Sequence, residues 1–327
     1  PTTPLKKNGS PATIVEVSPR DGLPAIPGGS STTDKIAYLN KLAEAGIQHI
    51  ECVAFTHPRL IPENADAEQV VAGMDKKPGI SYIGLAPNEI GCRRALITPI
   101  DDILTLVAAS DLFNKLNVGR TKKETLNKTL PAIFEAVRRT NKGVRSYILT
   151  AFGCPYSGDV PAETVVQMVL SLTYMGAKEV VLVDSTGMAT PKTVKELIKK
   201  IQAFQSGSNL AVHFHNTRGT AIANCIAAYE AGIRTFYTSV GGLSGTPYGA
   251  MELGFGYWNV PTEDLVHLFE EMGITTGIDL ERLLDCVRMA ESLIGRPLPG
   301  HILRAHPRSR LANPPDLSEI VHFRQLQ

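Results

Sequence analysis

The sequence predicts an α/β fold in which eight strand–helix units close into a parallel barrel, a TIM (β/α)₈ barrel with additional C-terminal helices. Three observations support this prediction. Short β-branched runs alternate with longer helical patterns, eight such runs are found, and together they occupy roughly 230 residues, the usual size of such a barrel. The alternative is an open doubly wound sheet, but no G-x-G-x-x-G motif follows the first strand.

The expected strands are mostly apolar and do not alternate polar with apolar residues, as is usual for parallel strands covered by helices. In chain order they span residues 13–17, 49–55, 80–85, 102–107, 144–150, 179–183, 211–215 and 235–240.

The expected helices follow these strands. The first, 33–45, begins after a Ser/Thr cluster suited to N-capping and ends at Gly46. Similar patterns span 124–140, 162–175, 191–204 and 219–231, whereas 91–97 and 111–116 are short. The segments E-A-G-I-Q-H-I-E, Y-M-G-A-K-E-V-V-L-V-D and E-A-G-I-R-T-F-Y-T-S-V share one order of helix end, glycine and strand, which indicates a repeated βα unit.

We expect three regions along the chain. Residues 1–12 are polar and proline-rich and form a flexible tail that lacks the apolar segment of a secretory signal. Residues 13–294 form the barrel together with two amphipathic helices, 263–272 and 280–293. Residues 295–327 form a C-terminal tail packed on the barrel or on a partner chain, and we expect a homo-oligomer, either a dimer or a tetramer.

Composition excludes several classes of protein. The formal net charge of +1 offers no strong field to recruit nucleic acid or a membrane surface, and no apolar run is long enough to span a membrane. Five cysteines without a C-x-x-C pair argue against a disulfide framework and favour a reducing compartment. We therefore expect a cytoplasmic enzyme, or an organelle-matrix one if a targeting segment was removed.

Polar residues gather where the expected strands end, and in a barrel this is where chemistry takes place. His213 and His215 are i, i+2 neighbours on one strand and therefore project to the same side. With Asp21 after the first strand they supply a carboxylate and two imidazoles, a facial set for a divalent cation with open positions for water or substrate. The alternative is a pair of ordinary polar histidines at a strand end.

Further charged residues lie at the same strand ends. Arg20 either forms a local ion pair with Asp21 or stabilises an oxyanion. Glu51 and Asp184 lie on apolar strands and are costly to bury unpaired, so each needs a partner. Their alternatives are a catalytic role or a buried salt bridge, for which Arg20 is the obvious mate.

The phrases at these strand ends occur in a specific order between about residues 13 and 293. They are V-x-P-R-D-G-L, I-E-C-V-A-F, A-P-N, A-A-S-D-L-F, G-C-P-Y-S-G, D-S-T-G, H-F-H-N-T, G-G-L-S-G-T-P-Y and T-E-D-L. In this order they resemble the 3-hydroxy-3-methylglutaryl-CoA lyases, within a wider superfamily of metal-dependent lyases and synthases. The resemblance implies a TIM barrel, Mg²⁺ or Mn²⁺ as cofactor, and an acyl-CoA or oxo-acid substrate.

The resemblance also implies roles for individual residues. Carried over by motif, Asp21, His213 and His215 are metal ligands, and Asn259, shortly before T-E-D-L, is the fourth. The catalytic candidates and the candidates for substrate contact complete the expected site. They are Arg20, Glu51, Asp184 and Thr246 for catalysis, and Arg20, Tyr147 and Arg218 for substrate.

The chain departs from the lyases at several positions. Thr246 stands where they carry a loop cysteine, and a hydroxyl is a poorer acid or base than a thiol. Asn216 follows His215 at a position where the lyases carry an aspartate. An asparagine at this position resembles the synthases that condense acetyl-CoA with 2-oxo acids. The stretch from Thr246 to Asn259 is longer and lacks their glycine before the asparagine. Arg218 either pairs with an anionic group of the substrate or caps the next helix.

Three functions follow from these features. The first is a lyase that cleaves a 3-hydroxy-3-methylglutaryl-CoA-like 3-hydroxyacyl-CoA to an acetyl-CoA-type product and a keto acid. The second is an aldolase or Claisen-type synthase acting on a 2-oxo acid. The third is a catalytically impaired barrel with a binding role. The intact set of charged strand-end residues argues against the third, whereas Thr246 keeps it open.

Overall fold

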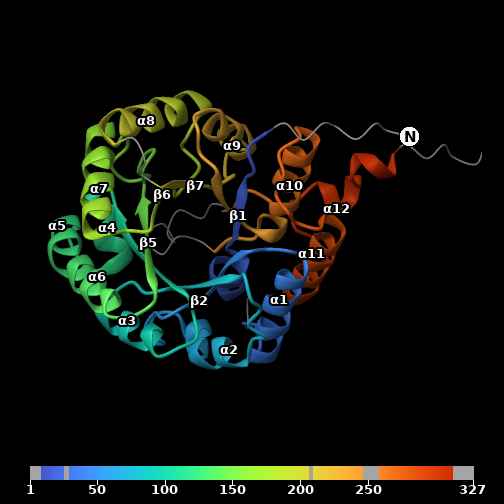
Figure 1. Cartoon of the computed structure of the whole chain (residues 1–327), viewed down its shortest axis with the longest axis horizontal. Coiled ribbons are helices and arrows are strands. Elements are labelled where there is room, and N and C mark those ends of the chain that lie inside the picture. The colour runs from blue at the N-terminus through green and yellow to red at the C-terminus, as the bar shows by residue number, and fades with distance from the viewer. Residues whose placement is uncertain (1–8, 26–28, 206–208, 246–257, 312–327) are drawn as a thin grey trace, which may run out of the picture.

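A computed structural model of the chain describes residues 9–25, 29–205, 209–245 and 258–311. Within these residues eight parallel strands pair in chain order and β8 pairs with β1, which closes the barrel (Figure 1). The strands are β1 (Thr13–Glu16), β2 (His49–Ala54), β3 (Ser81–Leu85), β4 (Asp102–Ala108), β5 (Gly143–Leu149), β6 (Glu179–Asp184), β7 (Leu210–Phe214) and β8 (Thr235–Thr238). The TIM barrel predicted from the sequence is therefore confirmed.

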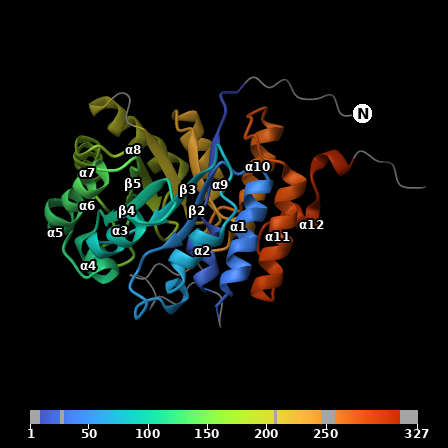
Figure 2. The ribbon, with the colours of Figure 1, turned by 60° about the horizontal axis from the view of Figure 1, so that its bottom comes forward.

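Helices form a ring outside the strands (Figures 1 and 2). In chain order they are α1 (Thr32–Glu44), α2 (Ala67–Gly73), α3 (Glu89–Leu96), α4 (Asp111–Val118), α5 (Lys122–Glu124), α6 (Leu130–Arg138), α7 (Ala162–Met175), α8 (Pro191–Phe204), α9 (Ala221–Glu230), α10 (Thr262–Glu271), α11 (Leu280–Ile294) and α12 (Ile302–Ala305). The helix α2 was not predicted from the sequence, because it is only about two turns long and shows no clear helical period.

The helix expected over 124–140 is present from Lys122 to Arg138 and contains one irregular turn. This π-helical turn, Thr125–Thr129, lies between α5 and α6, and the residues at its junctions keep right-handed helical dihedral angles. The side-chain amide of Asn114 donates to the Thr125 hydroxyl at 2.9 Å, which ties the turn to α4. Pro131, in the first turn of α6, also lacks the N–H that would continue the helical ladder.

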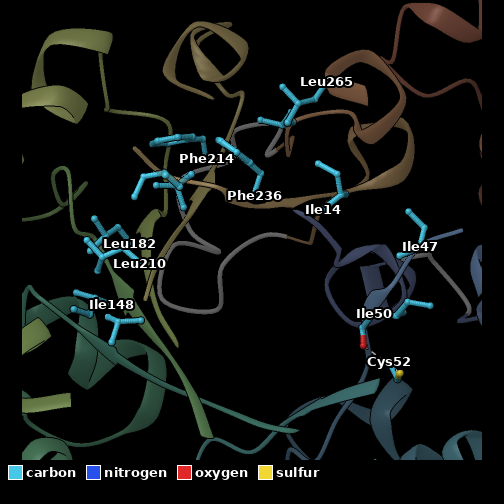
Figure 3. Close-up of a cluster of buried hydrophobic side chains, with 14 of the residues drawn as sticks. Ile14, Ile47, Ile50, Cys52, Ile148, Leu182, Leu210, Phe214, Phe236 and Leu265 are labelled. Carbon is cyan, nitrogen blue, oxygen red and sulfur yellow. Dashed lines mark hydrogen bonds between the residues drawn. The ribbon is translucent and has the colours of Figure 1, made fainter. Parts of the chain in front are cut away.

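Side chains alternate between the two faces of each strand. Val15, Val181, Ala211 and Tyr237 belong to the cluster inside the barrel. Their strand neighbours pack outward against the helices, as Figure 3 shows for Ile14, Leu182, Phe214 and Phe236 together with Leu265 of α10. The same parity decides which polar side chains enter the barrel at its ends.

A charged layer fills the barrel interior near the strands' N-terminal ends. The buried Arg145 guanidinium donates to Asp102 at 2.9 Å and to Glu179 at 2.7 Å. The Tyr237 hydroxyl also donates to Glu179, at 2.6 Å. These contacts fill the end of the barrel at which the strands begin. A substrate therefore enters at the other end, where the strands finish.

The helices after β8 complete the ring. In Figures 1 and 2, α11 lies between α10 and α1, and α12 lies beside them. After α11 the chain returns over the barrel end, where a Cβ on Gly241 would overlap the buried side chain of Leu298. At the other terminus, Gly9 and Ala12 donate backbone hydrogen bonds to Gly273 and Thr275. Among the described residues, no helix has both the length and the apolar character needed to cross a membrane.

Candidate active site

The predicted metal ligands meet at the C-terminal ends of β1 and β7. Asp21 lies on a π-helical turn, Ser18–Gly22, that begins directly after β1, and its amide donates to Val17 O at 2.8 Å. His213 lies on β7 and His215 just beyond it, both with inward parity. One ligand atom from each of Asp21, His213 and His215 lies within 4.8 Å of the others.

Asn259 completes this group from the far side of the loop that follows β8. Its Oδ1 lies 2.7 Å from Nε2 of His213, and its Nδ2 donates to Oδ2 of Asp21 at 2.8 Å. A backbone bridge pairs Asn259 with His215. The position predicted for the fourth ligand therefore lies beside the other three, although the longer stretch before it includes residues outside those described.

The donor set suits a divalent cation. It combines one carboxylate oxygen, one amide oxygen and two imidazole nitrogens, which is the hard to intermediate ligation that Mg²⁺ and Mn²⁺ accept. The two imidazole rings stack with an interplanar angle of 9° and centroids 5.0 Å apart, so they lie directly beside each other. No thiolate lies in the group, which disfavours a structural zinc site.

The protonation states favour metal binding. Burial lowers the pKa of His213 to about 3 and also lowers the pKa of His215, so both imidazoles are neutral at neutral pH. Burial alone would raise the pKa of Asp21, but Arg20 and the two histidines outweigh it and lower that pKa. The group therefore offers a carboxylate and two lone pairs without first losing protons.

Arg20 connects the metal group, which consists of Asp21, His213, His215 and Asn259, with the buried side chains of Glu51 and Tyr147. Its Nη1 donates to Asp21 Oδ1 at 2.9 Å and its Nε donates to Glu51 Oε2 at 2.6 Å. The other oxygen of Glu51 accepts from the Tyr147 hydroxyl. Burial raises the pKa of Glu51, and the Arg20 charge opposes that rise. The buried salt bridge considered for Glu51 is thus present, with Arg20 as its mate.

Asp184 lies apart from this group. It follows the inward residue Val183 on β6, so its side chain takes the outward parity. Its two carboxylate oxygens accept from the amides of Met188 at 2.8 Å and Ala189 at 2.9 Å. Burial raises the pKa of Asp184 to about 6 despite these bonds. Its backbone carbonyl, in contrast, faces the site and lies 2.9 Å from Nδ1 of His215.

Of the remaining candidate site residues, the structure describes Arg218 but not Thr246. Arg218 is exposed at the mouth of the barrel, where its Nη1 donates to the carbonyl oxygen of Thr186 at 2.6 Å. It therefore braces the loop after β6, and its charge also acts on Asp184. Thr246 lies outside the described residues.

The sequence analysis missed Ser244 as a member of the site. Its hydroxyl donates to Asp21 Oδ2 at 3.1 Å. The loop approaches so closely because the side chain of Leu243 packs on Gly22, where a Cβ would overlap it. A hydroxyl in the glycine-rich loop after the last strand was the available signal, but nothing in the sequence indicated which loop residue would reach Asp21.

Comparisons with known proteins show the family of the chain. A family model described as HMGL-like matches residues 12–290. The hydroxymethylglutaryl-CoA lyase YngG of Bacillus subtilis is 38% identical over 292 residues, which cover 89% of this chain and 96% of that protein. A Pseudomonas aeruginosa lyase, named for 3-hydroxy-3-isohexenylglutaryl-CoA and hydroxy-methylglutaryl-CoA, is 36% identical over 283 residues, covering 86% and 93%.

Solved structures give the same result. An HMG-CoA lyase from Acinetobacter baumannii, in complex with coenzyme A and 3-methylmalate, superposes with a TM-score of 0.87 at 34% identity. The match covers 93% of this chain and 98% of that one. The resemblance to these lyases and the placement among carbon–carbon lyases are both confirmed, and the chain belongs to the HMGL-like family.

Proposed function

We propose that this enzyme is a divalent-metal-dependent lyase that cleaves a 3-hydroxy-3-methylglutaryl-CoA-like 3-hydroxyacyl-CoA to an acetyl-CoA-type product and a keto acid. The observation that carries the proposal is the convergence of Asp21, His213, His215 and Asn259 at the barrel mouth, with Arg20 beside them. The acyl-CoA class is supported by the coenzyme A bound to the Acinetobacter relative.

In the proposed reaction, the C3 hydroxyl loses its proton and the C2–C3 bond breaks. The bonding electrons pass to C2 as a thioester enolate, C3 becomes a carbonyl, and a proton adds to C2. A bound Mg²⁺ or Mn²⁺, held by Asp21, His213, His215 and Asn259, would supply Lewis-acid stabilisation of the C3 oxygen. Arg20 stabilises the same oxygen as its negative charge develops.

The contacts of Arg20 support this role. Its Nε is committed to Glu51 and one Nη1 hydrogen to Asp21, which fixes the plane of the guanidinium. Arginine carries five N–H groups in a rigid fork, so Nη1 keeps a second donor for the substrate oxygen. The side chain is 11% exposed, so it reaches the open end of the barrel without losing its buried partner.

We also propose roles for Asp184, Tyr147, Arg218 and Thr246. Asp184 acts by holding the loop after β6, because both of its carboxylate oxygens are bound to amides of that loop. Tyr147 lies beneath Arg20 and is 3% exposed, which favours a positioning role over direct substrate contact. Arg218, at the mouth, and Thr246 remain candidates for binding an anionic group and for proton transfer. A homo-oligomer and a cytoplasmic or organelle-matrix location remain predictions.

The experiment that tests the proposal combines activity with metal content. Metal-loaded protein is incubated with a panel of 3-hydroxy-3-substituted acyl-CoAs and, separately, with 2-oxo acids plus acetyl-CoA, and the products are identified by mass spectrometry. We expect cleavage of the C2–C3 bond, with an acetyl-CoA-type thioester and a keto acid as products, from the first group only. The His213→Ala/His215→Ala double variant should lose both the ion and the activity. Condensation without cleavage would favour a synthase, and undiminished metal in the double variant would refute the ligand assignment.

A further inference from the structure

The two histidines of the metal group have their outer ring nitrogens held by different kinds of acceptor. Nδ1 of His215 lies 2.9 Å from the carbonyl oxygen of Asp184. A carbonyl oxygen only accepts, so the proton of this imidazole stays on Nδ1 and the lone pair of Nε2 faces the metal group. The backbone alone therefore sets the tautomer of His215.

His213 lies between two acceptors. Its Nε2 lies 2.7 Å from Oδ1 of Asn259, an amide oxygen that only accepts, and its Nδ1 lies 3.3 Å from the hydroxyl of Tyr147. A metal ion can bind at Nε2 only when the ring proton lies on Nδ1, where the acceptor within reach is the Tyr147 oxygen. A hydroxyl can either donate or accept. If it donates to Nδ1, the ring proton moves to Nε2 and blocks metal binding. If it accepts, Nδ1 keeps the proton and Nε2 is free to bind a metal.

The direction of the Tyr147 hydroxyl is set by Glu51. The hydroxyl donates to Oε1 of Glu51, while Oε2 of the same carboxylate is held by Arg20 at 2.6 Å. The guanidinium favours the ionised carboxylate, which only accepts. The hydroxyl proton of Tyr147 therefore points toward Glu51. Its oxygen accepts from Nη2 of Arg20 at 3.3 Å and keeps a second lone pair for the Nδ1–H of His213.

We propose that Tyr147 is a positioning residue that stabilises the metal-binding tautomer of His213 by accepting its Nδ1–H, under the control of the Arg20–Glu51 pair. The inference rests on the metal site of the proposed function. It gives Glu51 a role that no direct contact with the metal group supplies, because the carboxylate acts on His213 through the tyrosine hydroxyl. Partners of this kind typically change metal affinity by about 10–100-fold.

A matched control lies next to Tyr147. Tyr237 is equally buried, its ring lies 5.5 Å from that of Tyr147, and it stacks on His213 with centroids 6.2 Å apart. Its hydroxyl, however, donates to Glu179 at 2.6 Å and lies 3.3 Å from Arg145, in the charged layer below. Tyr237→Phe therefore removes a buried hydroxyl from a ring that contacts His213, without removing an acceptor for Nδ1.

The test measures the dissociation constant of Mn²⁺ by calorimetric titration for the wild type, Tyr147→Phe and Tyr237→Phe, with thermal melting as the check on folding. We expect Tyr147→Phe to bind Mn²⁺ at least about 10-fold more weakly and Tyr237→Phe to stay within about twofold of the wild type. Equal affinities in the wild type and Tyr147→Phe overturn the proposal, as do equal losses in both variants.

An isosteric variant keeps the proposal testable if Tyr147→Phe does not fold. In Glu51→Gln the amide oxygen should turn to Arg20, so the amide nitrogen donates to the Tyr147 oxygen and the hydroxyl proton points to His213. The variant should therefore weaken Mn²⁺ binding by a similar factor, and unchanged affinity contradicts the account. If wild-type protein binds no Mn²⁺, the metal site and this inference fail together, whereas a wild type that binds but tolerates both changes refutes the inference alone.

Discussion

At the residue scale, Arg20 forms ion pairs with two carboxylates in different surroundings. Its guanidinium contacts the Asp21 carboxylate at the open site and the fully buried Glu51 carboxylate beneath it. An arginine fits both tasks because its fork is planar and stays charged. The structure shows the ion pairs of Arg20 with Asp21 and Glu51, and its catalytic role stays a prediction. If both hold, substitution should reveal two separable effects.

Arg20→Gln should lower kcat by about 10²-fold or more, because an oxyanion donor is lost. It should also destabilise the fold by about 3–5 kcal/mol, because Glu51 keeps a buried charge without its partner. Steady-state kinetics and thermal melting measure the two effects. Arg94→Gln, which breaks an ion pair with Glu68 away from the metal group, serves as the control and should retain kcat. A change confined to KM would show that Arg20 only binds substrate.

Asp184→Asn tests whether this carboxylate anchors a loop or transfers a proton. An asparagine NH₂ would face one of the amides of Met188 and Ala189, so the loop should shift together with the carbonyl that holds His215. We expect weaker Mn²⁺ binding along with a lower kcat. A kcat lowered by about 10²-fold with unchanged metal affinity would instead support proton transfer.

At the element scale, the turn after β8 determines where Ser244 and Asn259 lie. Two buried carboxyl groups hold this turn: an oxygen of Glu16 accepts from the Val240 amide at 2.9 Å, and an oxygen of Glu263, at the start of α10, accepts from the Gly241 amide at 2.9 Å. The Asn259 amide in turn donates to the Gly242 carbonyl at 2.9 Å. The first turn of a helix thus supports the fourth ligand candidate.

Gly22→Ala should displace this loop, because the new methyl group would overlap the side chain of Leu243. A displacement of the loop by about 1 Å should lower kcat by about 10²-fold. Gly73→Ala on α2 is the control, since its methyl group would overlap only the flexible end of Ile36. If both variants keep wild-type kcat, the packing of Leu243 on Gly22 does not position the site.

Glu263 should make stability depend on pH. Burial, with a further contribution from the charge of Asp264, raises its pKa from 4.5 to about 8. Because the folded-state pKa is the higher one, the protonated acid stabilises the fold fully below about pH 4.5, and this stability is lost as pH rises to about 8. The loss amounts to about 1.4 kcal/mol for each pH unit between the two values. Chemical denaturation of Glu263→Gln should give a flatter pH profile, and a profile identical to that of the wild type would contradict this.

At the scale of the whole molecule, the sequence predicts the barrel well because strand runs and glycine-ended helices repeat along the chain. It also predicts the metal group, since i, i+2 parity places His213 and His215 together whatever the details of the fold. Parity also turns the side chain of Asp184 outward, one step along β6 from Val183, and its catalytic role stays a prediction. The position of Ser244 beside Asp21 could not be predicted in this way, nor could the series of hydrogen-bonded side chains Arg20, Glu51, Tyr147 and His213. Both depend on contacts between loops and strands that lie far apart in the sequence, which no local pattern encodes.

The central claim is that carbon–carbon cleavage depends on a divalent ion held at the barrel mouth. The most direct test is the turnover of 3-hydroxy-3-methylglutaryl-CoA and its 3-substituted analogues by wild-type protein before chelation, after chelation, and after Mg²⁺ or Mn²⁺ is restored. We predict cleavage of at least one of these thioesters with kcat/KM of about 10⁴ M⁻¹s⁻¹ or above, loss on chelation and recovery with the metal. Turnover that survives chelation, or no cleavage of any member of the series by metal-loaded protein, would contradict the claim.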